Sequence, residues 1–188
     1  MAPRVDELWC WRHPPARGAA GRCIGRTDLA VDPRKAKRLA HRIRAAARRQ
    51  ALPHEVWVSP SQRAFAVGRW LQRWGWRLHV DARLCEMDFG QWDGKAWTEV
   101  PWAEVEAWQV SLLHHAPGGG ESLLRLAARV HAFAGDVASN PRLLVSHGGW
   151  INALLHVPPG LQEMAASAWP APPRHGSLTR VCWPRASG

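Results

Sequence analysis

The sequence contains no apolar run of the roughly 20 residues that a membrane-spanning helix requires. Residues 1–7 are polar and carry charges of both signs. They therefore lack the basic and then apolar order of a secretory signal peptide. From these two absences we expect a cytoplasmic protein with no membrane partner.

Cysteine is also scarce: the 188 residues include only four, and no two of them form a Cys-x-x-Cys pair. This spacing argues against a zinc site and against a disulfide framework, so we expect ordinary reduced thiols. His114 and His115 could suggest a metal pair, but adjacent residues point in different directions on a helix. We interpret them as a solvated loop pair, and we predict no metal site and no cofactor. The cysteines are Cys10, Cys23, Cys85 and Cys182.

Acidic residues are fewer than basic ones, with 15 Asp and Glu against 25 Lys and Arg, and the formal net charge is +10. Such a charge favours anionic partners, either phosphorylated small molecules or nucleic acid. Much of the excess lies in residues 34–49, where Leu39 and Ile43 predict an amphipathic helix with a solvated basic face. These cations are not interleaved with aromatic residues, and no nucleic-acid-binding motif is recognised, so we predict no nucleic-acid partner.

A chain of 188 residues with a hydrophobic fraction of 46% fits one domain with a full-sized core, so residues 1–188 are predicted to form a single domain. Short apolar segments alternate with amphipathic ones, which predicts an α/β fold with a mostly parallel central sheet in a three-layer α/β/α arrangement. The last strand should lie at an edge. The predicted strands cover residues 8–11, 55–58, 77–80, 142–146 and 178–183. The predicted helices cover about residues 33–50, 64–74, 101–109, 122–138 and 150–156, and residues 83–97 and 158–173 are predicted loops.

Charged and imidazole side chains follow three of the predicted strands. Arg12 and His13 end the first strand, Arg63 comes shortly after the second, and His147 ends the fourth. Because the carboxyl ends of parallel strands meet at one edge of a sheet, we expect these side chains to face one crevice. Two guanidinium groups and two imidazoles suit a phosphate dianion, since the arginine fork matches phosphate oxygens. Each residue alone would more often cap a strand or lie in a loop, so the prediction depends on their joint placement.

Neighbouring residues complete the predicted site. The amides of Gly148 and Gly149 stand at the start of a helix and would add donors to an anion. Glu86 lies in a loop rich in acidic and aromatic residues and could supply a proton. Glu121, beside another predicted helix start, is interpreted as a helix cap.

Motifs spread over residues 8–155 resemble those of the histidine phosphatase (phosphoglycerate mutase-like) superfamily, and six of them stand in the order of that family. Gly25-Arg26-Thr27-Asp28 and the short chain look most like the α-ribazole phosphatase branch. The six blocks are Arg12-His13, Cys23-Ile24-Gly25-Arg26-Thr27-Asp28, Ser59-Pro60-x-x-Arg63-Ala64, Glu86-x-x-Phe89-Gly90-x-Trp92-x-Gly94, Pro117-Gly118-Gly119-Gly120-Glu121-Ser122 and Ser146-His147-Gly148-Gly149.

The resemblance implies a phosphoglycerate mutase-like fold and a metal-independent phosphomonoesterase that works through a phosphohistidine. His13 would attack phosphorus, and Arg12, Arg63 and His147 would hold the phosphoryl oxygens. Glu86 would protonate the leaving oxygen and then activate the water that frees the enzyme. No cofactor is implied, because the cationic side chains stabilise the developing charge.

The sequence departs from the family pattern just after the Arg-His pair. Pro14 stands where the family usually has glycine, and proline lacks the backbone N–H. Gly18 or Ala19 stands near the place of a common asparagine. We therefore expect one donor to the phosphate to be lost, and Arg17 could replace it.

Residues 84–124, which cover the phosphate pocket in the family as a lid, contain no arginine, only one lysine, several carboxylates and four tryptophans. This composition favours a small phosphate monoester whose leaving group is neutral or aromatic. α-Ribazole 5′-phosphate of cobalamin biosynthesis fits this description if its benzimidazole stacks on a tryptophan. Trp97 is the predicted stacking residue, and Arg26 is a second predicted substrate contact.

Several alternatives stay open at this point. The substrate could be another sugar or nucleotide-like monophosphate, or the enzyme could be of the phosphoglycerate mutase type. A non-catalytic relative would only bind a phosphorylated ligand, although the intact His13, Glu86 and His147 argue against it. The basic helix could belong to a nucleic-acid-binding protein. Whether the protein is a monomer or a homodimer is left open.

Overall fold

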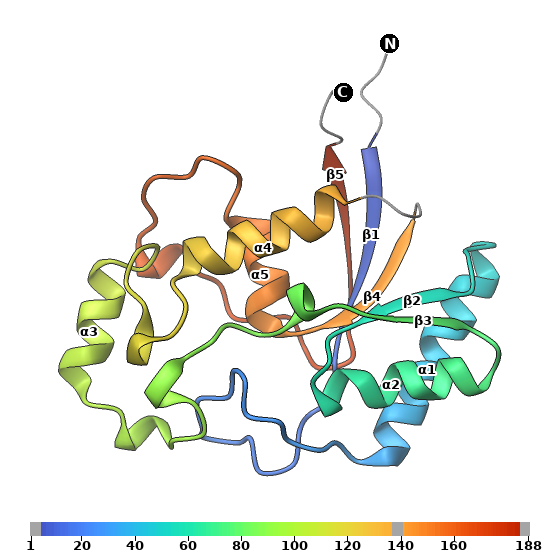
Figure 1. The fold of residues 1–188 in the computed structure, drawn as a ribbon, viewed down its shortest axis with the longest axis horizontal. Coiled ribbons are helices and arrows are strands. Elements are labelled where there is room, and N and C mark those ends of the chain that lie inside the picture. The colour runs from blue at the N-terminus through green and yellow to red at the C-terminus, as the bar shows by residue number, and fades with distance from the viewer. Residues whose placement is uncertain (1–4, 137–140, 185–188) are drawn as a thin grey trace.

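The fold is built on one five-stranded sheet. The computed structural model describes residues 5–136 and 141–184. The strands are β1 (Val5–Arg12), β2 (Glu55–Val58), β3 (Arg77–Val80), β4 (Arg142–Ser146) and β5 (Leu178–Pro184). Their order is β3-β2-β4-β1-β5 (Figure 1). The neighbouring strands β3 and β2, β2 and β4, and β4 and β1 pair in parallel, and β5 pairs antiparallel with β1 at the edge. The predicted mostly parallel sheet and the edge position of the last strand are confirmed.

Helices cover both faces of this sheet. α1 (Pro33–Arg49) and α2 (Gln62–Arg73) pack on one face, and α4 (Leu123–Gly135) and α5 (Gly148–His156) pack on the other (Figure 1). α3 (Trp102–Val110) lies away from the sheet, at the left of Figure 1. The predicted three-layer α/β/α architecture is therefore confirmed.

β1 shows why two helical layers form. Trp9 and Trp11 pack into the core shared with α1 and α2, whereas Leu8 and Cys10 pack into the core shared with α4 and α5. Successive side chains of a strand point to opposite faces, and all four of these are buried. A strand that is apolar on both faces is stable only between two layers, which explains its central position.

α1 begins where the sequence predicts. The Asp32 side chain accepts a hydrogen bond from the Arg34 N–H at 2.7 Å, and Pro33 takes the first helical position. Leu39 and Ile43 are buried against α2 and the sheet, which leaves the cations outside. The amphipathic character of this segment is confirmed.

The outer cations of α1 contact aromatic rings of α2. Lys37 Nζ lies 5.0 Å from the ring centre of Trp70, and Arg44 Cζ lies 4.8 Å from that of Trp74. The sequence prediction treated these cations as separate from aromatic residues, because the two helices are distant in the chain. The fold brings them together as cation–π pairs.

Several boundaries differ from the predictions for local reasons. β1 begins at Val5 rather than at residue 8, because its first residues pair with β5. α5 begins at Gly148 rather than at residue 150, directly after the cap residue His147. The helix predicted to end near residue 138 is described up to Gly135, and residues 137 and 138 lie outside the described residues. The predicted loops contain short 3-10 turns at Ala82–Leu84, Gly90–Trp92, Trp97–Glu99 and Ala166–Ala168.

The cysteines and the histidine pair lie as expected. All four cysteines are free thiols; three are buried and Cys182 is exposed. His114 is exposed in the turn that follows α3, with His115 half-buried beside it. Among the described residues, no helix combines the length and apolar character that a membrane crossing needs.

Candidate active site

The carboxyl ends of β1 and β4 bring two histidines together. His13 follows β1, His147 directly precedes α5, and their ring centres lie 4.9 Å apart. The His13 N–H donates to the Ser146 carbonyl at 3.0 Å, so the pairing of the two strands fixes this approach. Arg63, in the first turn of α2, donates from Nε to His147 Nδ1 at 3.3 Å. Residues that are far apart in the chain thus meet at one sheet edge, as the motif order predicts.

His13 is held in one tautomer. Its Nδ1 lies 2.6 Å from the Pro14 carbonyl oxygen, and since a carbonyl only accepts hydrogen bonds, Nδ1 carries the proton. Burial lowers the pKa of His13 well below its ordinary value, and the positive charge of Arg63 lowers it further. The ring is therefore neutral near pH 7, with its lone pair on Nε2. A neutral imidazole with a free lone pair is what nucleophilic attack requires.

His147 is fully buried beside His13 and has the opposite tautomer. Its Nδ1 accepts from Arg63, so Nε2 carries the proton and donates to Ser59 Oγ at 2.9 Å. Burial lowers the pKa of His147 well below its ordinary value, and the neighbouring His13 and Arg63 add to the effect. Ser59 was part of a predicted motif, but its role as the anchor of His147 was missed.

Arg63 is anchored by the loop over residues 23–28. Its Nη1 donates to the Thr27 carbonyl at 2.8 Å and its Nη2 to the Gly25 carbonyl at 2.6 Å. Asp93 holds that loop in turn, since its carboxylate accepts from the backbone N–H groups of Gly25, Arg26 and Thr27. The Gly25-Arg26-Thr27-Asp28 block therefore supports the guanidinium group of Arg63 through its backbone.

Arg12 retains donors for an anion. One contact holds its side chain, from Nη1 to the Pro173 carbonyl at 2.7 Å. Its Nε is buried and has no hydrogen-bond partner among the described residues. A buried guanidinium donor without a partner is costly in a folded protein, and an anion in the cavity would satisfy it.

Glu86 is held at the start of α5. Its carboxylate accepts hydrogen bonds from the N–H groups of Met87 at 3.0 Å, Gly149 at 3.0 Å and Trp150 at 3.1 Å. The prediction assigned the amide of Gly149 to phosphate, but this donor is directed to Glu86. A Cβ on Gly149 would lie 2.5 Å from Glu86 Oε1, so only glycine allows this approach.

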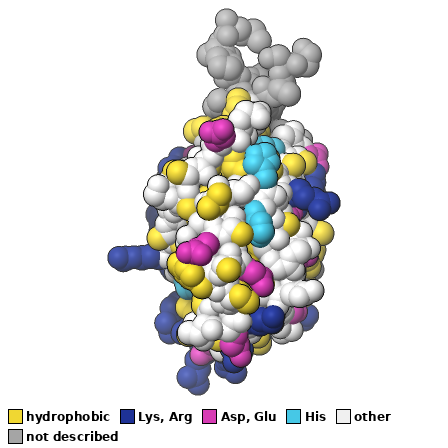
Figure 2. All heavy atoms as spheres, turned by 90° about the vertical axis from the view of Figure 1, so that its left-hand side faces the viewer, with side chains coloured by type: hydrophobic (Ala, Val, Ile, Leu, Met, Phe, Trp, Pro, Cys, Tyr) yellow, Lys and Arg dark blue, Asp and Glu magenta, His cyan; other side chains and the backbone are white. Residues whose placement is uncertain are grey.

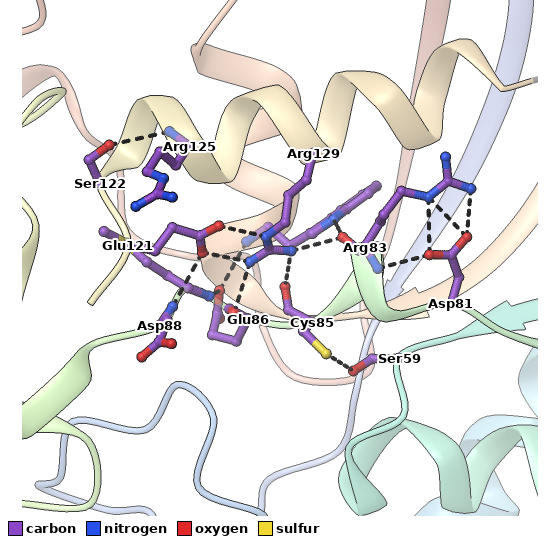
Figure 3. Close-up of polar contacts among 12 residues, drawn as sticks. Ser59, Asp81, Arg83, Cys85, Glu86, Asp88, Glu121, Ser122, Arg125 and Arg129 are labelled. Atoms are coloured by element: carbon purple, nitrogen blue, oxygen red, sulfur yellow. Dashed lines mark hydrogen bonds and ion pairs between the residues drawn. The ribbon is translucent and has the colours of Figure 1, made fainter.

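A second layer of contacts holds the backbone on which Glu86 stands (Figure 3). Arg129 of α4 donates to the carbonyl groups of Arg83 at 2.8 Å, Cys85 at 2.6 Å and Glu86 at 2.9 Å. The Glu121 carboxylate pairs with Arg129 at 2.8 Å. Glu121 is therefore not the helix cap that we predict from sequence; the neighbouring Ser122 caps α4 through the N–H of Arg125.

A cavity of about 570 Å³ opens over these residues. Arg12, His13, Arg63 and Glu86 line it, and so does Trp97, whose side chain is 43% exposed. Most of the other lining residues are apolar, which gives the cavity a cationic region and an apolar region. The apolar lining residues include Ile24, Met87, Phe89, Trp108, Leu112, Leu123 and Trp169.

Four predicted contacts, His147 among them, are absent from the residues that line the cavity. His147 is fully buried beside His13, and both of its ring nitrogens have partners in Arg63 and Ser59. Arg17 is exposed, and its backbone N–H pairs with Ala30. Arg26 is exposed as well and contacts Asp93 through its backbone. Gly148 is buried, and a Cβ there would lie 2.6 Å from Pro172 Cβ and 3.1 Å from Arg12 Cζ, so glycine leaves room for both side chains. The structure thus keeps His147 beside His13 but does not bring Arg17, Arg26 or Gly148 into the cavity.

The structure adds residues that the sequence did not reveal. Arg22 lines the cavity and donates to the Gly94 carbonyl at 2.8 Å. His175 lines it from the segment before β5, in a proline-rich region without periodicity. Neither residue has a local pattern that would single it out. Among the described residues, no group of three or more His, Cys, Asp and Glu side chains is placed to hold a metal ion.

The chain is similar in sequence to named bacterial phosphatases. It is 30% identical over 138 residues to glucosyl-3-phosphoglycerate phosphatase of Mycobacterium tuberculosis, covering 62% of this chain and 56% of that protein. It is 32% identical over 111 residues to a Hydrogenobacter thermophilus protein named for phosphoserine phosphatase activity, covering 53% of each. The chain thus spans a little over half the length of these curated relatives. Their names do not point to the α-ribazole phosphatase branch.

Solved structures share the fold. The structure named mycobacterial hydrolase 2 superposes with a TM-score of 0.78 at 26% identity, over 98% of this chain and 85% of that one. Mycobacterial glucosyl-3-phosphoglycerate phosphatase gives a TM-score of 0.73 at 25% identity, over 93% and 89% of the two chains.

The family profile accounts for almost the whole chain. Its match runs over residues 8–187 and so includes every strand-end residue described above. The order of the motifs, the parallel sheet and the clustered His13, His147, Arg12 and Arg63 agree with that match. The chain belongs to the histidine phosphatase superfamily, branch 1.

Proposed function

We propose that this protein is a phosphomonoesterase that works through a phosphohistidine formed on His13. The observation that carries the proposal is the Nδ1–H to Pro14 carbonyl bond, which leaves the lone pair of a neutral, buried imidazole on Nε2. Arg12 and Arg63 line the same cavity, as phosphoryl transfer requires of its stabilising cations. Family membership and the phosphatase names of the relatives support the same chemistry.

In the first step, His13 Nε2 attacks phosphorus. An N–P bond forms while the bond from phosphorus to the leaving oxygen breaks. Arg12 and Arg63 donate to the phosphoryl oxygens and stabilise the charge that develops on them, with His147 beside them. Glu86, in its protonated form, gives its proton to the leaving oxygen.

In the second step, the Glu86 carboxylate takes a proton from water. The water oxygen attacks phosphorus, the N–P bond breaks, and inorganic phosphate leaves. His13 returns to its neutral form with the proton still on Nδ1. The backbone contacts to Gly149 and Trp150 keep Glu86 in the cavity through both steps.

The finer proposal concerns the leaving group. Phe89, Trp97 and Trp108 line the cavity, and they belong to residues 84–124, which we propose to act as its lid. Figure 2 shows the side of the molecule that carries α3: hydrophobic and acidic side chains spread over it, and Lys and Arg gather towards its edges. A neutral aromatic leaving group would bury its surface against the indoles. The benzimidazole riboside of α-ribazole 5′-phosphate, an intermediate of cobalamin biosynthesis, has this character.

One observation favours a second class of substrate. Arg22 is a cation at the cavity besides the two arginines assigned to phosphate. It could pair with the carboxylate of a phosphorylated acid such as phosphoserine or glucosyl-3-phosphoglycerate, the substrates in the names of the relatives.

A substrate panel separates these two classes. We expect kcat/KM for α-ribazole 5′-phosphate to exceed that for phosphoserine, glucosyl-3-phosphoglycerate and 3-phosphoglycerate by at least about tenfold, which corresponds to about 1.4 kcal/mol. A preference for any of the acids would overturn the aromatic assignment. It would leave the phosphohistidine chemistry standing, because p-nitrophenyl phosphate tests that chemistry separately.

Trp97 tests the stacking part of the proposal. Trp97→Ala should raise KM for α-ribazole 5′-phosphate by roughly twofold to tenfold, since an aromatic pair contributes about 0.5–1.5 kcal/mol. KM for p-nitrophenyl phosphate should change less. Trp102→Ala is the matched control, because Trp102 is 64% exposed on α3 and does not line the cavity. Equal effects of the two variants would remove Trp97 from the binding site.

A further inference from the structure

The turn over residues 174–177 is fastened to the backbone of the Arg12-His13 pair. The Arg12 N–H donates to the Ser177 carbonyl at 3.2 Å, and the Gly176 N–H donates to the Arg12 carbonyl at 2.9 Å. The His175 side chain adds a third contact, from Nδ1 to the His13 carbonyl at 2.9 Å. Hydrogen bonds of His175, Gly176 and Ser177 with the Arg12-His13 backbone thus hold the His175 ring beside His13.

His175 lines the cavity that holds His13, and one of its ring nitrogens has no hydrogen-bond partner among the described residues. The two ring centres lie 5.3 Å apart, close to the 4.9 Å between His13 and His147. Since the His13 carbonyl can only accept, the proton of neutral His175 is on Nδ1. Nε2 has no hydrogen-bond partner among the described residues, and the ring lines the cavity.

The surroundings of His175 are cationic. His175 is exposed to solvent on one side, but partial desolvation at the cavity lowers its pKa, and the charges of Arg12 and Lys35 lower it further, so the ring is neutral in the free protein near pH 7. Arg42 of α1 approaches the same turn at Gly176. Glu86 is the one carboxylate among the described residues that line the cavity. An incoming dianion would offset the positive charge and favour the protonated ring.

We propose that His175 is a further phosphoryl-binding residue, which takes up a proton when the phosphoryl group binds and donates it from Nε2 to a phosphoryl oxygen. This inference rests on the proposed function, because it takes Arg12, His13 and Arg63 as the site of the phosphoryl group. The oxygens of a phosphate dianion only accept hydrogen bonds, so a contacting imidazole nitrogen must carry a proton. Nδ1 already holds one, so the contact requires a second proton from solvent. Binding is therefore linked to proton uptake.

Tungstate tests this linkage, because it is a tetrahedral dianion that does not itself titrate near neutral pH. Calorimetry of tungstate binding in two buffers with different protonation enthalpies counts the protons taken up. We expect the unmodified protein to take up about one proton more than His175→Asn, and its affinity to fall by up to about tenfold per pH unit as the pH rises. The asparagine amide keeps a donor near the place of Nδ1 but has no titrating nitrogen at the place of Nε2.

Two further variants separate binding from folding. His175→Gln places an amide donor near the place of Nε2, so it should bind tungstate more tightly than His175→Asn at high pH, without the extra proton. His114→Asn, which removes an exposed histidine outside the cavity, should take up as many protons as the unmodified protein. Thermal unfolding of all variants shows whether the fold is retained.

The outcomes distinguish the two proposals. The role of His175 would be overturned if the unmodified protein and His175→Asn took up the same number of protons on binding tungstate. It would also be overturned if the tungstate affinity of the two proteins changed equally with pH. The proposed function would still stand if the unmodified protein hydrolysed p-nitrophenyl phosphate through a phosphohistidine. A protein that neither hydrolyses this substrate nor binds tungstate would overturn both.

Discussion

At the scale of single residues, one backbone carbonyl fixes the tautomer of His13, the proposed nucleophile. The Pro14 carbonyl accepts from Nδ1, and this leaves the lone pair of Nε2 for phosphorus. Proline at this position lacks an N–H, but its carbonyl serves the nucleophile as any residue's carbonyl would. The departure from the family pattern thus removes one backbone N–H and leaves the tautomer of His13 intact.

The nucleophile gives the first prediction. His13→Ala should abolish turnover and the phosphoenzyme, because the neighbouring His147 has both nitrogens occupied by Arg63 and Ser59. Rapid quenching with labelled substrate measures the adduct, which should be labile in acid and stable in base. His114→Ala, outside the cavity, should form the adduct normally. An adduct that persists in His13→Ala would assign the nucleophile elsewhere.

Glu86 gives the second prediction. Glu86→Gln keeps the shape of the side chain but removes the transferable proton, and general acid–base catalysis contributes roughly 10²–10⁴ in rate. We expect a loss of kcat in that range for substrates with poor leaving groups. The loss should be much smaller for p-nitrophenyl phosphate, whose leaving group needs little protonation. Equal losses on both substrates would show that Glu86 is not the acid.

At the scale of elements, α4 positions Glu86, the proposed acid, through Arg129, which does not line the cavity. Arg129 binds three carbonyl groups around Glu86, and Glu121 fixes the guanidinium from the side (Figure 3). These contacts join α4 to the segment between β3 and α3. A change on α4 should therefore affect catalysis through the placement of Glu86.

Arg129 gives the third prediction. Arg129→Lys keeps the charge but loses the fork of donors, and a displaced catalytic group can cost up to about 10²-fold in rate. We expect kcat to fall for poor leaving groups and to fall less for p-nitrophenyl phosphate, as for Glu86. Arg125→Lys, on the exposed side of α4, is the matched control.

A double variant shows whether Arg129 acts through Glu86. In the Glu86→Gln background, Arg129→Lys should cost little further activity, because coupled residues are not additive. Full additivity of the two losses would mean that Arg129 contributes by another route. Thermal unfolding of the single variants separates this effect from a general loss of stability.

The elements and the strand-end residues could be predicted from the sequence, because both depend on local patterns. Apolar strands followed by Arg12-His13 and by His147 fix the sheet edge on which the site is built. Arg22 and His175 could not be found in this way, since the segments that carry them have no periodicity. Their place in the cavity follows from long-range contacts such as that between His175 and the His13 carbonyl.

Dependence on long-range contacts also explains why the phosphate donors predicted from the sequence, the Gly149 amide and Arg17, have other positions in the structure. The glycines at the start of α5 looked like phosphate donors, but the contact of Gly149 with Glu86 depends on how residues 85–87 pack against α5. Arg17 looked like a replacement donor by its nearness in sequence to His13. Its position instead follows from the bridge between Ala16 and Val31, which leaves Ala16 on the cavity and Arg17 exposed.

At the scale of the whole molecule, the buried His13 and His147 make the stability of the fold depend on pH. Burial lowers the pKa of His13 and of His147, whereas each would titrate near 6.5 in the unfolded chain. Below that pH the unfolded state binds protons that the folded state does not bind. The free energy of unfolding therefore falls as the pH drops, and above that pH the contribution of these groups is fully present.

This linkage gives the fourth prediction. Each histidine should lower the free energy of unfolding by up to about 1.4 kcal/mol per pH unit below about pH 6.5, until its folded-state pKa is reached. Urea unfolding at a series of pH values measures the slope. His147→Gln should reduce that slope by up to about 1.4 kcal/mol per pH unit, because the unfolded chain then binds one proton fewer. This holds whatever the effect of the substitution on stability at neutral pH. If His147→Gln kept the full slope, His147 would titrate alike in the folded and unfolded states, and the neutral imidazole beside His13 would have to be abandoned.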